Sequence, residues 1–254
     1  MFGVLLGVAL LAAFDLWGPV RTDIRVFDPV LVARLDTDTW RSYYDRRPAR
    51  LFMQLAELMR DEFHFPLLRS YVAAAHSARA AFEFKYGRAR RDYERALPEL
   101  TAYFAMLRRV SVSPFDVRRA SDLELEWWIV HRSRPDTPQA ELERALANAA
   151  SALYGVPASL LGTYAHERAE AMTIRDTGEA DGSLGEHDWD EIARHLRAAW
   201  GALAKVVRPS TPAEPVATAV EARSHVAGAG ATRRQRDTGI LAARSSSPVR
   251  SATK

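Results

Sequence analysis

The chain has 254 residues, of which 48% are hydrophobic, so it can bury one core of moderate size. It contains no Cys, which excludes a disulfide framework, a thiolate zinc site and a thiol nucleophile. The net charge of +3 is unevenly distributed, because residues 208–254 hold eight basic and three acidic residues, a net +5. The preceding part of the chain is therefore slightly acidic, and the high isoelectric point comes from the C-terminal segment.

The N-terminal segment, residues 2–20, is apolar apart from Asp15. Its length lies near the minimum for a helix that spans a bilayer, roughly 17–25 residues. Arg21 and Arg25 follow the segment and no basic residue precedes it, which by the positive-inside rule places the remaining chain in the cytoplasm. We therefore expect residues 1–26 to be a single-pass transmembrane anchor with a basic flank. A buried core helix is the alternative.

Residues 27–207 show helical patterns separated by prolines and glycines. Asp28 followed by Pro29 is a typical helix start, with Asp as the N-cap and Pro in the first turn. A polar loop is expected over residues 178–185. Long helices joined by short breaks predict an all-α helical bundle. The spacing of apolar residues predicts helices over residues 29–47, 51–63, 66–86, 90–110 with an interruption at Pro98, 115–132, 138–154, 157–176 and 189–207.

Residues 208–254 are rich in Pro, Ala, Gly and Ser and show no periodic apolar face. Such a segment cannot bury enough surface to offset its loss of entropy on ordering, which predicts a disordered basic tail. Its arginines could contact anionic lipid or nucleic acid. Their wide spacing favours a solubilising extension instead, so a nucleic-acid partner is not expected.

Several short runs of the chain resemble a family of bacterial helical proteins with an N-terminal hydrophobic segment. The resemblance covers about residues 27–207 and implies a shared helical domain, without an assigned activity or functional residues. Those runs are Phe27-Asp28-Pro29, Trp40-Arg41-Ser42-Tyr43-Tyr44, Asp92-Tyr93-Glu94, Ala96-Leu97-Pro98, Phe115-Asp116-Val117 and residues 123–132.

The run at residues 123–132 is the most apolar stretch after the N-terminus, and it also carries charge. Helical spacing predicts that Trp127 and Trp128 pack centrally on neighbouring faces. Glu124 and His131 share a face with Trp128, so some polar groups should be carried into the interior. This helix is the best sequence-level indication of a site.

Arg79 lies on the apolar stripe of its helix, between Ala75 and Phe82. A buried arginine needs an acidic partner, because an unpaired buried charge costs several kcal/mol. Glu124 and Glu126 are the first candidates, and the sequence predicts a buried pair between one of them and Arg79. The alternative is that Arg79 reaches out to solvent.

His166 and Glu170 are four residues apart and would be neighbours on one helix face. Such a pair is half of a possible metal site, but a site needs three or more ligands. The Glu-x-x-His pattern of helical carboxylate metal sites does not occur. An ordinary solvated pair is favoured, and no metal, cofactor or catalytic residue is predicted.

Aromatic and basic residues are mixed at Trp40, Arg41, Tyr43 and Tyr44. Trp and Tyr prefer the headgroup depth of a membrane, so this group could form an interfacial belt. Its distance along the chain from the apolar segment makes packing within the bundle the favoured interpretation.

The sequence favours a membrane-anchored helical binding or structural module, placed by its anchor in the bacterial inner membrane. A protein partner is possible, and no small molecule is indicated. One alternative is anionic-lipid or nucleic-acid binding through the basic tail. The other is an enzyme or metal-binding protein whose polar site in the bundle core includes Arg79, Glu124, Glu126, His131, His166 and Glu170. The chain lacks Walker, GxGxxG, G-x-S-x-G and H-E-x-x-H motifs, which excludes the common nucleotide, hydrolase and protease signatures.

Overall fold

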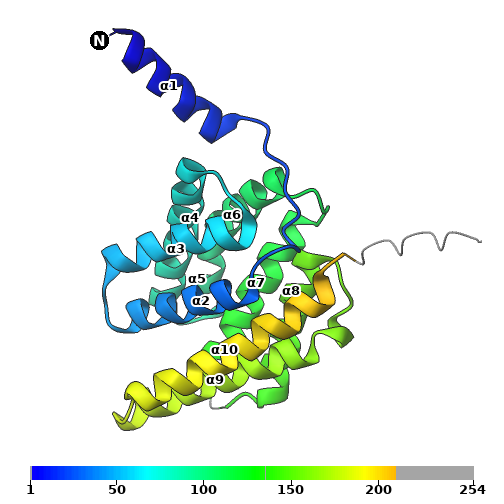
Figure 1. The fold of residues 1–254 in the computed structure, drawn as a ribbon. Helices are drawn as coiled ribbons and strands as arrows, with labels where there is room; N and C mark the ends of the chain where they lie inside the picture. The colour runs from blue at the N-terminus through cyan, green and yellow to red at the C-terminus, as the bar shows by residue number, and fades with distance from the viewer. Residues whose placement is uncertain (1, 135, 210–254) are drawn as a thin grey trace, which may run out of the picture. The chain divides into compact units, whose positions relative to one another are not determined.

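Helices joined by short connections make up nearly all of residues 2–134 and 136–209, which the computed structural model describes (Figure 1). Within these residues, strand pairing is limited to one isolated bridge between Thr22 and Ser111. The predicted all-α class is confirmed. The elements are α1 (Phe2–Trp17), α2 (Pro29–Tyr44), α3 (Pro48–Phe63), α4 (Leu67–Tyr86), α5 (Arg90–Tyr93), η1 (Glu94–Ala96), α6 (Leu97–Val110), α7 (Val117–Arg132), α8 (Gln139–Tyr154), η2 (Ala158–Leu160), α9 (Gly162–Asp181) and α10 (Glu186–Val207).

The prediction that residues 208–254 form a disordered tail falls, from residue 210 onward, outside the described part of the chain. Arg208 and Pro209 are the last residues described. The Arg208 guanidinium donates from Nη2 to the carbonyl oxygen of Phe27 at 3.3 Å. This bond brings the end of α10 back to the segment that precedes α2.

Local sequence signals account for most helix boundaries. Asp28 caps α2 by accepting hydrogen bonds from the backbone N–H groups of Val30 and Leu31, and Pro29 occupies the first turn. Gly155 ends α8 in the left-handed conformation, with φ at 69°. These predicted starts and stops are therefore confirmed.

The polar loop predicted for residues 178–185 is shorter than expected, because α9 continues to Asp181. Gly178 lies inside the helix and is buried. A Cβ atom at this position would lie 3.1–3.2 Å from atoms of Leu184, which folds back over the helix. Gly178 thus serves close packing rather than helix termination.

Eight helices form a closed ring in which each packs against the next one along the chain. The order is α2, α3, α4, α6, α7, α8, α9 and α10, and α10 packs against α2 to complete the circuit. The contact between α9 and α10 is the most extensive, and the two helices run side by side in Figure 1. Ile192, Leu196 and Leu203 of α10 are fully buried, as the clean periodicity of that segment predicts. The ring positions residues from every one of these helices around one interior.

Helix α1 is attached to α4 by reciprocal hydrogen bonds. The Asp15 carboxylate accepts from the backbone N–H groups of Leu68 and Arg69, the first turn of α4. The buried Arg69 side chain donates to the carbonyl oxygens of Phe14, Asp15 and Gly18 at the end of α1. Each helix end therefore has some of its free backbone groups paired by the other helix.

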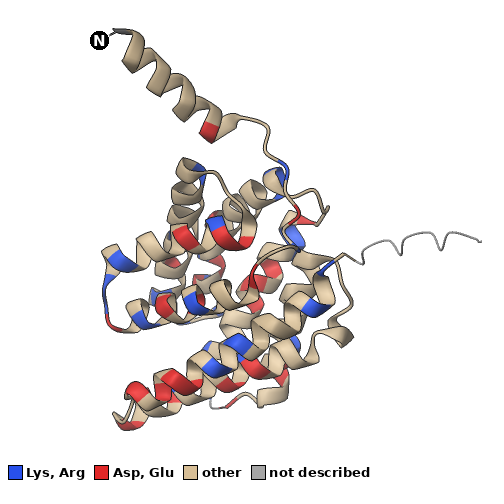
Figure 2. Ribbon diagram, viewed as in Figure 1, with Lys and Arg blue, Asp and Glu red and all other residues tan. Residues whose placement is uncertain are grey.

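The transmembrane prediction for residues 2–20 is not supported. Among the described residues, no helix combines the length and the apolar composition required to cross a bilayer. The apolar run includes Gly18 and Pro19, which lie beyond the end of α1 at Trp17. The 16 residues of α1 extend about 24 Å, which is less than the ~30 Å thickness of the hydrocarbon core of a bilayer. Along the described length of α1, Asp15 is the single charged residue (Figure 2).

Candidate functional site

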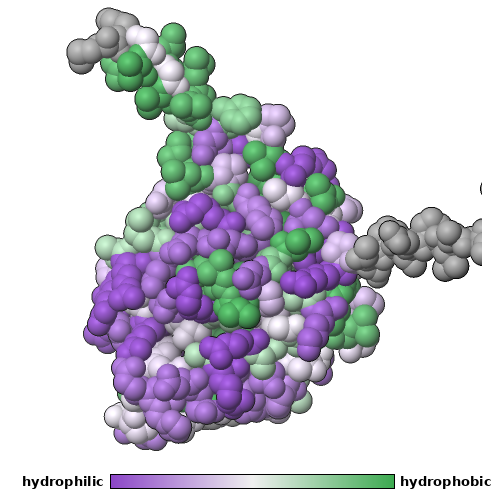
Figure 3. Space-filling view, in the orientation of Figure 1, coloured by the Kyte–Doolittle hydropathy of each residue, from purple (hydrophilic) through white to green (hydrophobic). Residues whose placement is uncertain are grey.

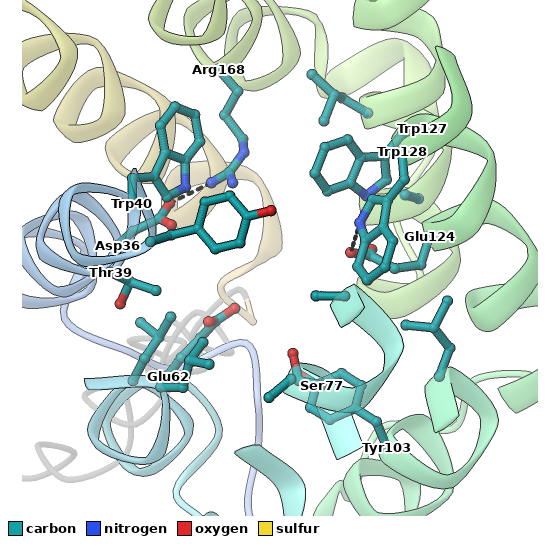
Figure 4. Close-up of a pocket in the computed structure, with 18 of the residues that line it drawn as sticks. Asp36, Thr39, Trp40, Glu62, Ser77, Tyr103, Glu124, Trp127, Trp128 and Arg168 are labelled. Carbon is teal, nitrogen blue, oxygen red and sulfur yellow. Dashed lines mark hydrogen bonds and ion pairs between the residues drawn. The ribbon is translucent and has the colours of Figure 1, made fainter. Parts of the chain in front are cut away.

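The helix ring encloses a cavity of about 440 Å³, and all eight of its helices contribute lining residues (Figure 4). The lining is mainly apolar and aromatic, with a small number of polar groups. Three lining residues are exposed, Tyr43 of α2 and Phe82 and Lys85 of α4. We place the mouth of the cavity at these residues. Trp40, Tyr43 and Tyr44 thus line the cavity, and the favoured prediction of bundle packing agrees with their position.

The most connected polar group in the cavity is the Asp36 carboxylate of α2. Its Oδ2 accepts hydrogen bonds from Arg168 Nη1 of α9 at 2.6 Å and from Trp200 Nε1 of α10 at 2.8 Å. Asp36, Arg168 and Trp200 are all buried. This cluster joins the first and last helices of the ring, so a buried charge pair lies where the ring closes.

Aromatic rings surround the Arg168 guanidinium. Its Cζ atom lies 5.6, 5.8 and 5.5 Å from the ring centroids of Trp40, Tyr164 and Trp200, within cation–π range. Burial acts to lower the pKa of Arg168, but the Asp36 carboxylate outweighs it and raises the pKa above its usual range. Among the described residues, the buried Nε atom has no hydrogen-bond partner. The guanidinium is therefore a fixed cation whose donors are only partly used.

Glu62 of α3 is a second buried acid in the cavity, with 5% of its surface exposed. Its Oε1 accepts a hydrogen bond from the Tyr154 hydroxyl at 2.8 Å. Burial raises the pKa of Glu62 to about 8, although the Tyr154 bond and the Arg168 charge act to lower it. At neutral pH this carboxyl is therefore mostly protonated.

Glu124 of α7 is the third acid, and its Oε1 accepts from Trp128 Nε1 at 3.0 Å. Burial raises the pKa of Glu124 as well, against the effect of this hydrogen bond. In Figure 4, Glu124, Trp127 and Trp128 lie on one side of the cavity, and Glu62, Asp36 and Arg168 lie on the other. The cavity thus places one guanidinium and three carboxyl groups around a largely aromatic interior.

Arg79 does not pair with Glu124 or Glu126, so that prediction was wrong. Its side chain is 63% exposed, and its nearest acidic partner is Glu99 at 3.9 Å. Arg79 follows Ala75 at helical spacing but lies at the exposed edge of the apolar stripe, from which a long side chain reaches water. The alternative that it extends into solvent is the correct one.

Glu126 and His131 of α7 differ in their position relative to the cavity. Glu126 forms an ion pair with Arg90 at 2.8 Å, and both side chains are exposed. His131 lines the cavity, but its Nε2 lies 3.1 Å from Asp176 Oδ2. The structure therefore brings Glu124 and His131 to the cavity and leaves Glu126 at the surface.

His166 and Glu170 form neither a hydrogen bond nor an ion pair with each other. The Nδ1 atom of His166 lies 2.9 Å from Glu143 Oε1, and this contact raises the pKa of His166. Glu170 instead accepts a hydrogen bond from Gln139. Across the described residues, no group of three or more His, Asp and Glu side chains could hold a metal ion. The half-site that the spacing suggested is not completed.

Trp127 and Trp128 both line the cavity, and each is half-buried rather than buried. Their rings stack edge to face, with centroids 6.1 Å apart, and the Trp128 ring also contacts Phe84. Central packing was predicted for them, and the structure places them on the cavity wall.

The main charged residues of the cavity, Asp36, Glu62 and Arg168, were absent from the predicted site. Each lies at helical spacing within a buried stripe: Asp36 follows Val32, Glu62 follows Met59, and Arg168 follows the buried Ala165. A search for charged residues within apolar stripes could have found all three, as it found Arg79. It could not have paired them, because Asp36 and Arg168 are 132 residues apart.

Comparisons of the chain with protein-family models, with curated proteins and with solved structures found no match in any of the three. The resemblance noted in the sequence therefore stays a prediction. The functional argument depends on the geometry and electrostatics of the cavity.

The Asp36–Arg168 pair should show strong coupling in a double-mutant cycle. Asp36→Ala leaves the Arg168 guanidinium buried without its ion-pair partner. Arg168→Met likewise leaves the Asp36 carboxylate buried and unpaired. Each change should lower the free energy of unfolding by about 3–5 kcal/mol. The double variant should lose much less than the sum, as measured by urea unfolding.

The exposed Glu191–Arg194 pair of α10, at 2.7 Å, is a matched control, and its removal should leave the free energy of unfolding almost unchanged. Additive losses at Asp36 and Arg168 would contradict the proposed coupling.

Glu62 should make stability depend on pH. The carboxyl ionises near 4.5 in the unfolded chain and near 8 in the folded chain, so between these values only the unfolded state releases the proton. Its contribution to stability therefore falls as pH rises through this window and levels off above it. Glu62→Gln removes the titration and keeps an acceptor for Tyr154. We expect this variant to match the wild type near pH 4.5 and to be more stable by roughly 3–5 kcal/mol at pH 9.

Denaturant unfolding at both pH values measures this difference. Glu57→Gln, on the same helix but outside the cavity lining, is the control. A constant difference between wild type and Glu62→Gln across the range would show that Glu62 is not held in its protonated form.

Proposed function

We propose that this protein is a binding module that holds a small, largely apolar molecule inside its helix ring. The cavity of about 440 Å³ carries this proposal. Small-molecule sites typically occupy about 300–1,000 Å³ and combine an apolar lining with a few converging polar groups. The ring cavity has both properties, with polar groups from α2, α3, α7 and α9.

An interior that serves only to stabilise the fold would not account for this cavity. Protein cores are close-packed and contain few voids larger than a water molecule. Structural cores also avoid ionisable groups without charge partners, because their burial costs stability. Glu62 and Glu124 incur that cost and lie beside unfilled space. A bound molecule would account for both features.

We propose membrane attachment through α1. Its exposed apolar side chains lie on all sides of the helix, whereas a protein groove would be matched by one stripe. In Figure 3, the described side chains of α1 are mostly hydrophobic. Trp17 at the end nearest the ring would lie at headgroup depth. Exposed fractions range from 59% to 75% for Val4, Leu5, Leu6, Val8, Leu10, Leu11, Phe14 and Trp17.

The same proposal assigns the helix ring to the cytoplasmic face of a bacterial inner membrane. Arg21 and Arg25 follow α1, and the anionic lipids of the cytoplasmic leaflet attract basic residues close to the membrane surface. The length of α1 is compatible with insertion into the bilayer from that face, without requiring it to cross.

Acid–base catalysis in the same cavity is the second candidate function. The observation in its favour is the raised pKa of Glu62, because enzymes tune carboxyl groups in this direction for proton transfer at neutral pH. Turnover of a bound molecule that Glu62→Gln abolishes would establish it. The third function, lipid or nucleic-acid binding by the basic tail, concerns residues outside the described part from residue 210 onward.

Filling the cavity should block binding. Ala81 of α4 lines the cavity, so Ala81→Phe places a ring in it. The full chain should bind the neutral, polarity-sensitive dye Nile red, and this variant should bind it at least about tenfold more weakly, about 1.4 kcal/mol. Fluorescence titration measures the affinity.

Ala198→Phe, on an exposed position of α10, is the matched control and should bind as the wild type does. Dye bound to α1 contributes equally in both variants. Equal affinity of all three proteins would contradict the proposed binding cavity.

Charged residues in α1 should abolish membrane attachment. A Leu6→Asp/Leu10→Asp variant introduces two carboxylates, each costing on the order of 2–3 kcal/mol within a bilayer. We expect the full-length protein to float with phosphatidylethanolamine–phosphatidylglycerol vesicles and the variant to remain in solution. Leu160→Asp, at a 59% exposed apolar residue of η2, should float normally. Vesicle binding by the double variant would exclude α1 as the attachment.

A further inference from the structure

Acidic groups outnumber basic groups inside the cavity. Asp36, Glu62 and Glu124 face it, and the Arg168 guanidinium is paired with Asp36. Lys85 also lines the cavity but is exposed at its mouth, and the lining residue His131 has its Nε2 atom 3.1 Å from Asp176 Oδ2. Two carboxyl groups therefore lie in the interior without a basic partner among the described residues. A positive charge placed between them would supply the missing partner.

Each of these two carboxyl groups has one oxygen available. Glu62 accepts the Tyr154 hydroxyl at Oε1, and Glu124 accepts the Trp128 indole N–H at Oε1. Within the described chain, the structure records no hydrogen bond to the Oε2 atom of either residue, although the side chain of Trp127 also acts, beside Trp128, to lower the pKa of Glu124. Figure 4 shows Glu62 and Glu124 projecting into the cavity from opposite sides. The free oxygens can therefore accept hydrogen bonds from one occupant.

Arg168 shows how this interior accommodates a cation. Its guanidinium combines one ion pair, to Asp36, with the faces of three aromatic rings. The opposite side repeats these components without the cation: a carboxyl group, Glu124, beside the rings of Trp127 and Trp128. The negative face of an aromatic ring attracts organic cations as well as guanidinium groups.

We propose that the molecule bound in the cavity is a small organic cation: a protonated amine on an apolar body, with its ammonium group between Glu62 and Glu124. The inference rests on the proposed function, since it names the class of ligand for the same cavity. The ammonium N–H groups donate to the free carboxyl oxygens, and the positive charge favours ionisation of Glu62 and Glu124, whose protons pass to solvent. The apolar body lies against the aromatic wall. An anion of the same shape gains no such ion pair from Glu62 and Glu124, and either carboxyl group would repel it once ionised.

Three ligands that share one body test this inference: 2-(2-naphthyl)ethylamine, 2-(2-naphthyl)ethanol and 3-(2-naphthyl)propionate. Calorimetry with the full chain measures their affinities. We expect the amine to bind at least about tenfold more tightly than the alcohol, and the propionate to bind most weakly. The Glu62→Gln/Glu124→Gln variant should bind the amine no better than the alcohol.

Glu126→Gln is the matched control, because Glu126 lies on the same helix as Glu124 but pairs with Arg90 at the surface. It should keep the full preference for the amine. Circular dichroism verifies that the variants are folded, and Glu62→Gln by itself should be more stable than the wild type at neutral pH.

The outcomes separate the inference from the function on which it rests. Equal binding of all three ligands, blocked by Ala81→Phe, would overturn the cation inference and keep the binding cavity. Tightest binding of the propionate would overturn it in favour of recognition by Arg168. Binding of Nile red with none of the three naphthyl compounds would also overturn it. Failure of every probe, the dye included, would reject the proposed function itself.

Discussion

The closure of the helix ring depends on one buried charge pair, Asp36 with Arg168. The pair joins α2 to α9, and the Trp200 indole brings α10 to the same carboxylate. Two charges removed from water stabilise a fold only when their geometry is good and their other hydrogen-bonding groups are satisfied. Here the carboxylate oxygen has two donors and three aromatic rings cover the guanidinium, but the buried Nε atom of Arg168 has no hydrogen-bond partner among the described residues, so the pair meets this condition only in part. The first and last helices of the ring thus share a specific partner, which apolar packing alone does not provide.

This arrangement also explains why the interior is hollow rather than packed. Large aromatic side chains project from opposite walls, and acidic groups lie among them. Carboxyl groups in such surroundings hold their protons, as the raised pKa values of Glu62 and Glu124 indicate. In the proposed function, the groups that lower the stability of the empty interior are the groups that would select its ligand. The proposal therefore assigns stability and recognition to the same set of side chains.

Helix α1 is attached to the rest of the structure through its C-terminal end. Its apolar side chains are not covered by the ring, and the connection to α4 consists of hydrogen bonds through Asp15 and Arg69. Polar contacts of this kind fix a helix end in place without burying its apolar surface. This surface remains exposed, so the proposed membrane attachment and the proposed ligand binding involve different elements.

The sequence by itself determined the local structure: the all-α class, the Asp28 cap, the Gly155 stop and the periodic face of α10, because caps, breakers and helical spacing act over a few residues. It also indicated that α7 brings Glu124 and its tryptophans to a site. Only the tertiary structure decided which charges meet. Arg79 and Arg168 both follow apolar residues at helical spacing, yet one reaches solvent and the other pairs with Asp36, 132 residues away. The packing of distant helices decides which side of an apolar stripe is buried and which residue pairs with a charged side chain on that stripe. No local sequence pattern encodes this packing.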